Sequence, residues 1–159
     1  MIKVRLQIAS GEIYDTIDQY SLVYLSSDTI FSAPLRPFES TKYPEQDGEN
    51  VNPSTVYEPF DYKVKFFVQA ELGLENANKK IAAFNKLLYS ENDSGLKTFN
   101  RVAFYNDYKK VKIVGYPSLI SEVDEDDFWR DSAGRTTDVV CVEWSIHVDK
   151  PQECDFNLL

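Results

Sequence analysis

Alternation of apolar and polar residues dominates this chain, and a period of two is typical of strands that bury one face. In the segment 138–148, for example, Val140, Val142, Trp144 and Ile146 recur at every second position. The strands that such patterns predict cover, with approximate bounds, residues 2–9, 19–26, 62–70, 98–105, 109–116 and 138–148. The turn residues Asn106-Asp107 lie between the fourth and fifth of these and predict a hairpin.

One segment, about residues 75–89, shows the three-and-four spacing of an amphipathic helix instead. Its apolar stripe consists of Leu74, Ala77, Ile81, Phe84 and Leu88, widened by Leu87. We therefore expect an α+β fold of mainly antiparallel strands, either a sandwich or a half-barrel, with this helix packed on the sheet. No internal repeat and no second boundary is visible, so residues 1–159 are expected to form one domain.

Between residues 27 and 61 the alternation stops, and five of the seven prolines fall there. A loop of this length without structure of its own is uncommon inside a domain. Two interpretations remain open: an ordered surface meander with short edge strands, or an arm that reaches a neighbouring subunit. Proline keeps such a segment extended, whereas aromatic residues such as Phe38, Tyr43 and Tyr57 give it apolar surface to bury.

The charge of the chain limits its partners. Its 159 residues carry a net charge of −9, with 26 acidic residues against 17 Lys and Arg. A protein that grips phosphates needs a basic patch, so sequence-specific nucleic-acid binding is not expected. No apolar run is long enough to span a membrane. The alternating N-terminus does not have the apolar stretch of a signal peptide, so we expect synthesis in the cytoplasm without export.

Two groups of residues were considered for catalysis or metal binding. Cys141 and His147 lie on one face of a predicted strand, but six positions at about 3.3 Å each separate them by roughly 20 Å, which excludes a thiol–imidazole dyad. The acidic residues between Glu122 and Asp131 could bind a hard cation, yet they lack the glycine and distal Glu of a calcium loop. A solvated loop tethered by Phe128 and Trp129 is favoured. We therefore predict no catalytic, cofactor or metal site.

The stretch 43–49 (YPEQDGE), the aromatic strand after Tyr57 and the helix 78–88 (NKKIAAFNKLL) resemble the N-terminal domain of bacteriophage distal tail proteins. The likeness extends to a following hairpin and covers about residues 20–148. It implies a tail-tube-like fold and a structural subunit of a phage or prophage tail, of the distal-tail or baseplate type. Such a protein is not an enzyme.

The resemblance further implies a ring, commonly a hexamer, which contacts other tail proteins in the virion after assembly in the bacterial cytoplasm. Heterologous contacts close a ring, so each copy presents two different surfaces. The predicted interface residues are Tyr20, Tyr24, Phe38, Tyr43, Asp47, Gly48 and Tyr57. The negative charge would suit a channel that DNA crosses without sticking. The alternative is a small carbohydrate- or protein-binding module with a concave aromatic patch that includes Trp129.

Overall fold

The computed structural model describes residues 4–8, 11–42, 44, 47–69, 74–122 and 139–158. Its elements are β1 (Val4–Gln7), β2 (Ile13–Asp15), α1 (Thr16–Tyr20), β3 (Val23–Ser27), β4 (Glu39–Thr41), β5 (Asn50–Asn52), β6 (Phe60–Gln69), α2 (Leu74–Leu87), β7 (Tyr89–Glu91), β8 (Lys97–Phe99), β9 (Val102–Asn106), β10 (Val111–Pro117), β11 (Ser121–Glu122), β12 (Val139–Val148) and the 3-10 turn η1 (Pro151–Glu153).

Eight of the strands form one sheet in the order β2-β1-β9-β10-β12-β6-β3, and β11 pairs with β12. Every pairing in this sheet is antiparallel. The longest ladder joins β6 to β12 over ten residue pairs, from Val139↔Gln69 to Val148↔Phe60. The expected α+β class with mainly antiparallel strands is confirmed, and so are the predicted strands that became β1, β6, β10 and β12.

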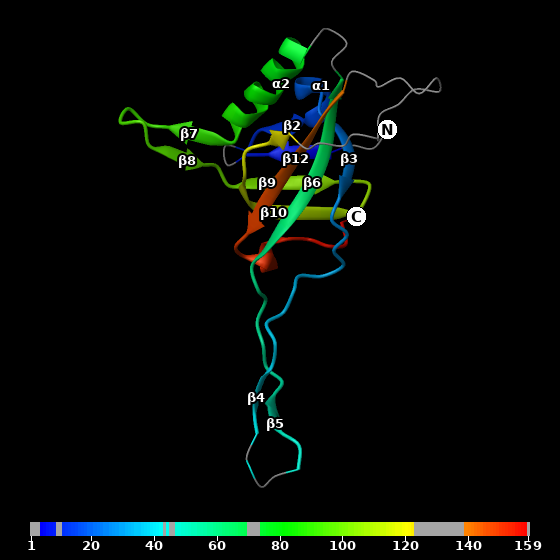
Figure 1. Ribbon diagram of the computed structural model, residues 1–159, viewed down its shortest axis with the longest axis vertical. Coiled ribbons are helices and arrows are strands. Elements are labelled where there is room, and N and C mark those ends of the chain that lie inside the picture. Colours follow the sequence, from blue (N-terminus) through cyan, green and yellow to red (C-terminus); the bar gives the residue numbers. More distant parts are fainter. Residues whose placement is uncertain are drawn as a thin grey trace.

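Strand β10 belongs to two halves of the sheet. Its residues Val111–Gly115 pair with β9, whereas Tyr116 and Pro117 pair with β12. The strands β9 and β10 therefore run across the long strands β6 and β12 (Figure 1). A glycine is needed where the two halves meet, because a Cβ on Gly115 would lie 2.2 Å from the carbonyl oxygen of His147. The sheet thus folds over on itself as a half-barrel.

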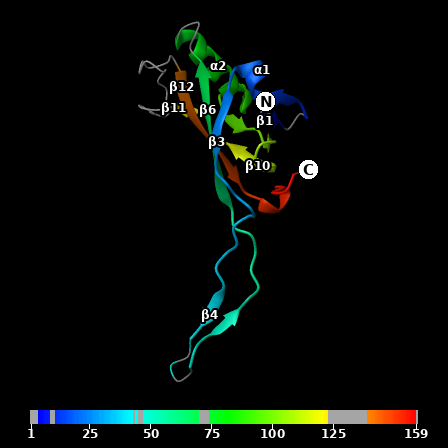
Figure 2. The same cartoon turned by 90° about the vertical axis from the view of Figure 1, so that its right-hand side faces the viewer.

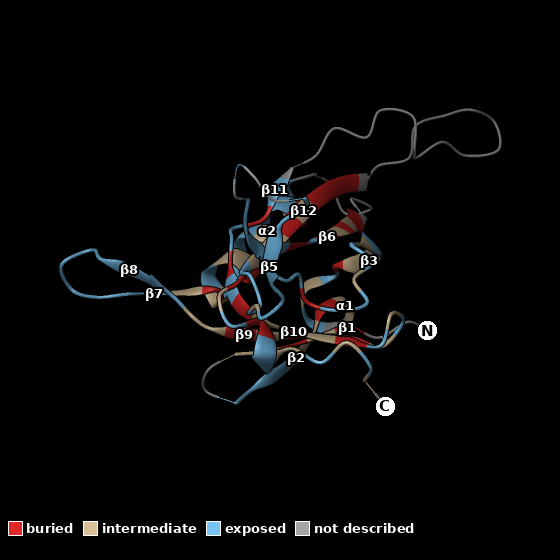
Figure 3. Cartoon of the chain, turned by 90° about the horizontal axis from the view of Figure 1, so that it is seen from below, coloured by how far each residue is buried: buried red, intermediate tan, exposed pale blue. Residues whose placement is uncertain are grey.

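Aromatic side chains fill the space inside this bend. Phe66, Phe104 and Trp144, from β6, β9 and β12, lie with ring centroids 5.6 to 6.4 Å apart and are fully buried. Helix α2 closes one end, since the ring of Phe84 meets Trp144 edge-on at 5.5 Å. Figure 3 shows the buried residues concentrated between the sheet halves and the helix. The predicted helix and its packing on the sheet are confirmed.

The predicted strand 19–26 is wrong in its first part, because the chain forms α1 there and β3 begins only at Val23. Helix α1 starts after Asp15, whose Oδ1 accepts a hydrogen bond from the Ile17 amide over 2.9 Å. It ends at Tyr20, and the next residue, Ser21, has a left-handed φ of 56°. A helix of five residues is too short to show a 3.6-residue period, so alternation among Tyr20, Leu22 and Tyr24 appeared strand-like.

The predicted strand 98–105 is interrupted, because residues 97–99 form β8 and residues 102–106 form β9. The predicted hairpin about Asn106-Asp107 is confirmed, since β9 pairs with β10. Strand β8 pairs with β7 in a separate hairpin that projects from the body beside α2 (Figure 1). The Asn92 Oδ1 accepts hydrogen bonds from the amides of Ser94 and Leu96, which fixes the turn. The residues 91–95 (ENDSG) have the composition of a turn that ends a helix, and strands of three residues are too short to show alternation.

Candidate functional site

The most conspicuous feature is a long two-stranded projection, here called the arm (residues 28–59), that leaves the body after β3 and returns into β6. Figures 1 and 2 show from two directions that it extends far from the sheet. Strands β4 and β5 pair near its outer end, with Ser40 opposite Val51. An isolated bridge pairs Leu35 with Tyr57 nearer to the body. The arm is thus a narrow ribbon whose described residues are exposed apart from Ala33, which is buried, and Ile30 and Thr55, which are half-buried.

Hydrogen bonds between its two halves hold the inner part of the arm together. The amide of Arg36 donates to the Val56 carbonyl over 3.0 Å, and the amide of Glu58 donates to the Pro34 carbonyl over 2.8 Å. The Thr55 hydroxyl donates to the Arg36 carbonyl over 2.7 Å. Proline cannot donate to such a ladder, so the prolines of the arm keep its pairing short and its strands extended.

Large apolar side chains lie uncovered along the arm. Phe31 is 87% exposed and Phe38 is 58% exposed, although a phenylalanine is usually among the most buried residues. Other exposed apolar residues of the arm are Leu35, Val51, Val56 and Tyr57. Single exposed apolar residues are ordinary, but a series of them along one projection indicates an interaction surface.

The arm is also acidic. Residues 28–59 contain six Asp and Glu residues against Arg36 and Lys42, which gives a net charge of −4. Like charges disfavour contact between two such arms at low ionic strength. A surface that receives the arm must therefore offer apolar groups and must not be acidic itself.

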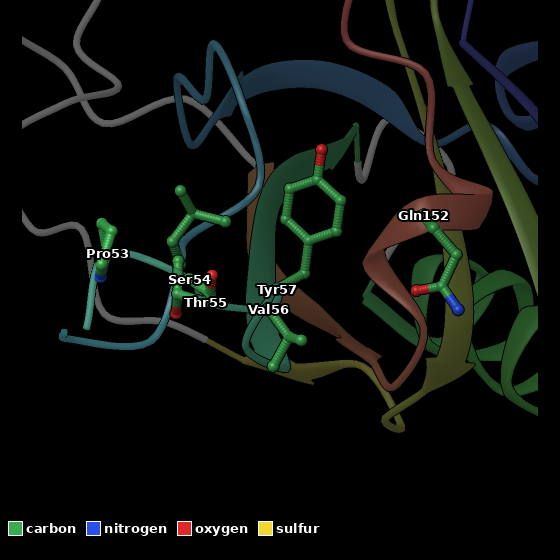
Figure 4. Close-up of a pocket in the computed structure, with 7 residues that line it drawn as sticks. Pro53, Ser54, Thr55, Val56, Tyr57 and Gln152 are labelled. Atoms are coloured by element: carbon green, nitrogen blue, oxygen red, sulfur yellow. The ribbon is translucent and has the colours of Figure 1, made fainter. Parts of the chain in front are cut away.

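An open hollow of about 790 Å³ lies where the arm joins the body (Figure 4). It is lined by Leu35, Pro53, Ser54, Thr55, Val56, Tyr57 and Gln152. Gln152 comes from η1 and the others from the arm. The polar side chains of this lining are the hydroxyls of Ser54, Thr55 and Tyr57 and the amide of Gln152, and no carboxylate, imidazole, thiol or amine stands among the lining residues.

Four of the predicted interface residues lie on the arm, spread along its length rather than in one cluster. Phe38 lies just before β4, and Tyr57 lies beside the hollow with half of its surface exposed. Asp47 and Gly48 are exposed near the outer end, where Gly48 has a left-handed φ of 83°. Tyr43 lies outside the described residues.

The other two predicted residues belong to the body. Tyr20 packs its ring edge-on against Phe84 at 5.4 Å, and burial raises the pKa of its hydroxyl. Tyr24 lies on β3 at the base of the arm, where its hydroxyl is 2.7 Å from Ser27 Oγ. The two groups of residues are therefore not one continuous surface, although Tyr24 connects with the arm through Ser27.

The arm is attached to the body through Ser27 and Thr29, which contact Asn106 and Lys109. Ser27 Oγ accepts a hydrogen bond from Asn106 Nδ2 over 3.2 Å, and Asn106 is fully buried. Lys109 Nζ donates to the Ser27 carbonyl and to Thr29 Oγ1, both over 2.6 Å. The sequence signal was the Asn106-Asp107 pair, which predicted a turn but not its contact with a segment about 80 positions earlier.

The residues considered for catalysis lie apart. Cys141 is buried on β12 opposite Phe67, whereas His147 lies near the other end of the strand, exposed, with Nδ1 2.8 Å from Asp61 Oδ1. No disulfide joins Cys141 to Cys154 in the described chain. The acidic residues 123–131 lie outside the described ranges. Elsewhere in those ranges, no group of three His, Cys, Asp or Glu side chains is arranged to hold a metal, and no helix is long and apolar enough to cross a membrane.

Comparison with known proteins gives a match by fold. No family model matches the sequence, and no curated protein matches it. Among solved structures, the chain is similar to the Dit protein (gp 19.1) of phage SPP1, described as a paradigm of the hub adsorption apparatus in phages that infect Gram-positive bacteria. The TM-score is 0.60 at 11% identity, over 93% of this chain and 50% of that protein. The chain thus spans half the length of the phage protein, and the fold expected from the resemblance to distal tail proteins is confirmed.

Proposed function

We propose that this chain is a structural subunit of a phage or prophage tail, a ring protein of the distal-tail or baseplate type that acts by self-assembly and by docking to other tail proteins. In this proposal it is not an enzyme. The observation that carries the proposal is an arm with uncovered apolar side chains on a fold similar to that of a phage hub protein.

The direction of the arm supports a contact with another molecule. It extends away from the sheet and helices of its own chain, so its outer apolar residues Phe38 and Val51 do not reach the core. If the receiving surface lies on a second copy, the contact is heterologous, and repetition of one heterologous contact closes a ring or continues as a filament. We propose a ring, with six copies as the first expectation.

The net charge is consistent with a tube through which DNA passes. With −9 on each copy, a ring would present acidic surface that repels phosphates rather than retaining them. Such a protein would bind no nucleic-acid sequence and no membrane. It would be assembled in the bacterial cytoplasm and would reside in the virion tail.

The proposal is tested by measuring the native mass of the protein over a range of concentrations, together with negative-stain images of the largest species. We expect a discrete species of several protomers, with closed rings in the images. Phe38→Ser should weaken assembly without unfolding the chain, because Phe38 is exposed. Leu119→Ser removes an exposed apolar residue from the body and is the matched control.

A protein that stays monomeric at every concentration would contradict the self-assembly. If such a monomer were stabilised against thermal unfolding by oligosaccharides, the small binding module would become the better description. If Phe38→Ser and Leu119→Ser weakened assembly equally, the interface would not be specific to the arm.

A further inference from the structure

We infer that a polar cluster at the root of the arm, made of Ser27, Asp28, Asn106 and Lys109 and here called the root clamp, fixes the direction of the arm before any partner is bound. The inference concerns how the binding element is positioned. Its consequence for assembly rests on the function proposed above, whereas the effect on the arm itself does not.

The clamp holds three consecutive residues of the outgoing chain. Ser27 is bound through its side chain by Asn106 and through its carbonyl by Lys109. Asp28 pairs with β6, since its amide donates to the Lys63 carbonyl over 3.0 Å and its Oδ2 accepts from the Lys63 amide over 3.1 Å. Thr29 Oγ1 accepts the second bond from Lys109. Ser27 and Thr29 are therefore fixed to the turn between β9 and β10, and Asp28 is fixed to β6.

The donors of the clamp are themselves held in place. Asn106 is fully buried, and its Oδ1 accepts hydrogen bonds from the amides of Tyr108 and Lys109 over 3.0 and 3.1 Å. This fold of the β9–β10 turn directs Lys109 toward the arm. A charged donor that bridges two acceptors gives stronger bonds than a neutral one. The turn between β9 and β10 thus holds the first residues of the arm against the body.

A two-stranded ribbon that projects alone is marginally stable in water, and its direction would vary if it were attached by backbone alone. Fixing its first residues to the body removes part of that freedom in the unbound protein. A binding element that is ordered beforehand loses less conformational entropy when it docks. Lys109 and Asn106 are therefore positioning residues: they act on assembly through the arm and need not touch the partner.

The test uses Lys109→Met, which keeps an unbranched apolar side chain and removes the ammonium group. Hydrogen exchange of the 159-residue chain is followed by mass spectrometry. We expect the amides of Asp28, Arg36 and Glu58 to exchange about tenfold faster, because a charge-assisted contact is lost. Amides of β12 should be unchanged. Lys109→Arg should restore most of the protection, and Lys97→Met, which alters an exposed lysine on the separate β7–β8 hairpin, should have no effect.

The second readout is assembly of the same variants. We expect Lys109→Met to raise the protein concentration at half-assembly by roughly tenfold, since part of the arm must then be ordered on binding. Unchanged exchange in the arm of Lys109→Met would overturn the inference. Faster exchange with unchanged assembly would overturn the positioning role. If the natural chain itself does not assemble, the proposed function fails, but the exchange experiment still decides whether the clamp orders the arm.

Discussion

Tyr62 donates a hydrogen bond from its hydroxyl to Ser27 Oγ over 2.9 Å, and this bond joins the strand that enters the arm to the strand that leaves it. Tyr62 lies on β6 with its ring in the core, 6.4 Å from that of Phe104. Burial raises the pKa of the Tyr62 hydroxyl, so it remains protonated and able to donate over the whole neutral range. The base of the arm is thus closed from inside the body as well as from its surface.

Tyr62→Phe should remove this bond while the ring stays in place. Ser27 Oγ keeps its contacts with Tyr24 and Asn106, so no buried acceptor is left without a partner. We expect the free energy of unfolding to fall by about 0.5–1.5 kcal/mol in urea denaturation. Tyr108→Phe, at an exposed tyrosine, should change it by less than about 0.5 kcal/mol. Equal effects of the two substitutions would show that the bond does not stabilise the fold.

Gly115→Ala should destabilise the body where the two halves of the sheet meet. The new Cβ would meet a backbone carbonyl, which cannot rotate away as a flexible side chain could. Overpacking of this kind typically lowers the free energy of unfolding by about 1–3 kcal/mol. Gly48→Ala provides a comparison, because at that site nothing lies within 4 Å and only the left-handed φ opposes the change. A Gly115→Ala protein as stable as the natural chain would mean that β10 and β12 can separate there without loss.

Phe84→Ala should be the most destabilising of these changes. The ring is fully buried between Tyr20 and Trp144, so its removal leaves a cavity under α2. Substitutions of this type lower the free energy of unfolding by about 3–5 kcal/mol. Lys86→Ala, on the exposed side of the same helix, should have an effect within about 0.5 kcal/mol. Chemical denaturation of both variants checks the prediction, and a loss below about 1 kcal/mol for Phe84→Ala would contradict it.

The ion pair between Arg101 and Asp149 makes the free energy of unfolding depend on pH. The guanidinium of Arg101 contacts Asp149 at 2.7 Å and also Glu153. Burial is the largest single influence and by itself would raise the pKa of Asp149. The hydrogen bond and charge of Arg101, together with a backbone hydrogen bond and the charge of Lys150, exceed it and hold that pKa below its ordinary value. A carboxyl group whose pKa is lower in the folded than in the unfolded state stabilises the fold at pH values above the unfolded-state pKa. This contribution is lost as the pH falls through the folded-state pKa.

Arg101→Met should therefore reduce the free energy of unfolding by about 1 kcal/mol at pH 6, as expected for a partly exposed pair. The difference from the natural chain should shrink as the pH falls from about 4 through the lowered folded-state pKa of Asp149, below which this carboxyl is protonated in both the folded and the unfolded state. Urea denaturation at a series of pH values measures it. A difference that stays constant down to pH 2 would show that Arg101 acts by packing, for example over the ring of Tyr116, rather than by charge.

The parts of the fold that sequence predicted well are those in which one residue pattern continues long enough to be recognised. Ten-residue alternation in β6 and β12, and the stripe around Phe84 in α2, each include several buried positions. Short elements were not predicted, because their residue patterns are too short to be recognised. Helix α1 and the strands β7 and β8 contain three to five residues each, and their formation depends on side-chain contacts to the backbone, such as that of Asp15.

The site was predicted in part. Proline content and aromatic residues indicated that residues 27–61 were unusual, and Phe38 and Tyr57 proved to be exposed there. What fixes the arm was not predictable, because Lys109 and Ser27 are far apart in sequence and neither belongs to a recognisable motif. Such contacts depend on which strands become neighbours, and the period of a strand does not specify its partner.

The place of β12 in the sheet sets the order in which this protein can fold. It is the last long strand in sequence, yet it lies between β10 and β6. During synthesis at about 5–20 residues per second, β6 therefore waits several seconds with one edge open and its apolar residues, among them Val64 and Phe66, without their cover. A ribosome-bound chain that stops before β12 should recruit chaperones or aggregate, whereas release of the complete strand should allow the half-barrel to close.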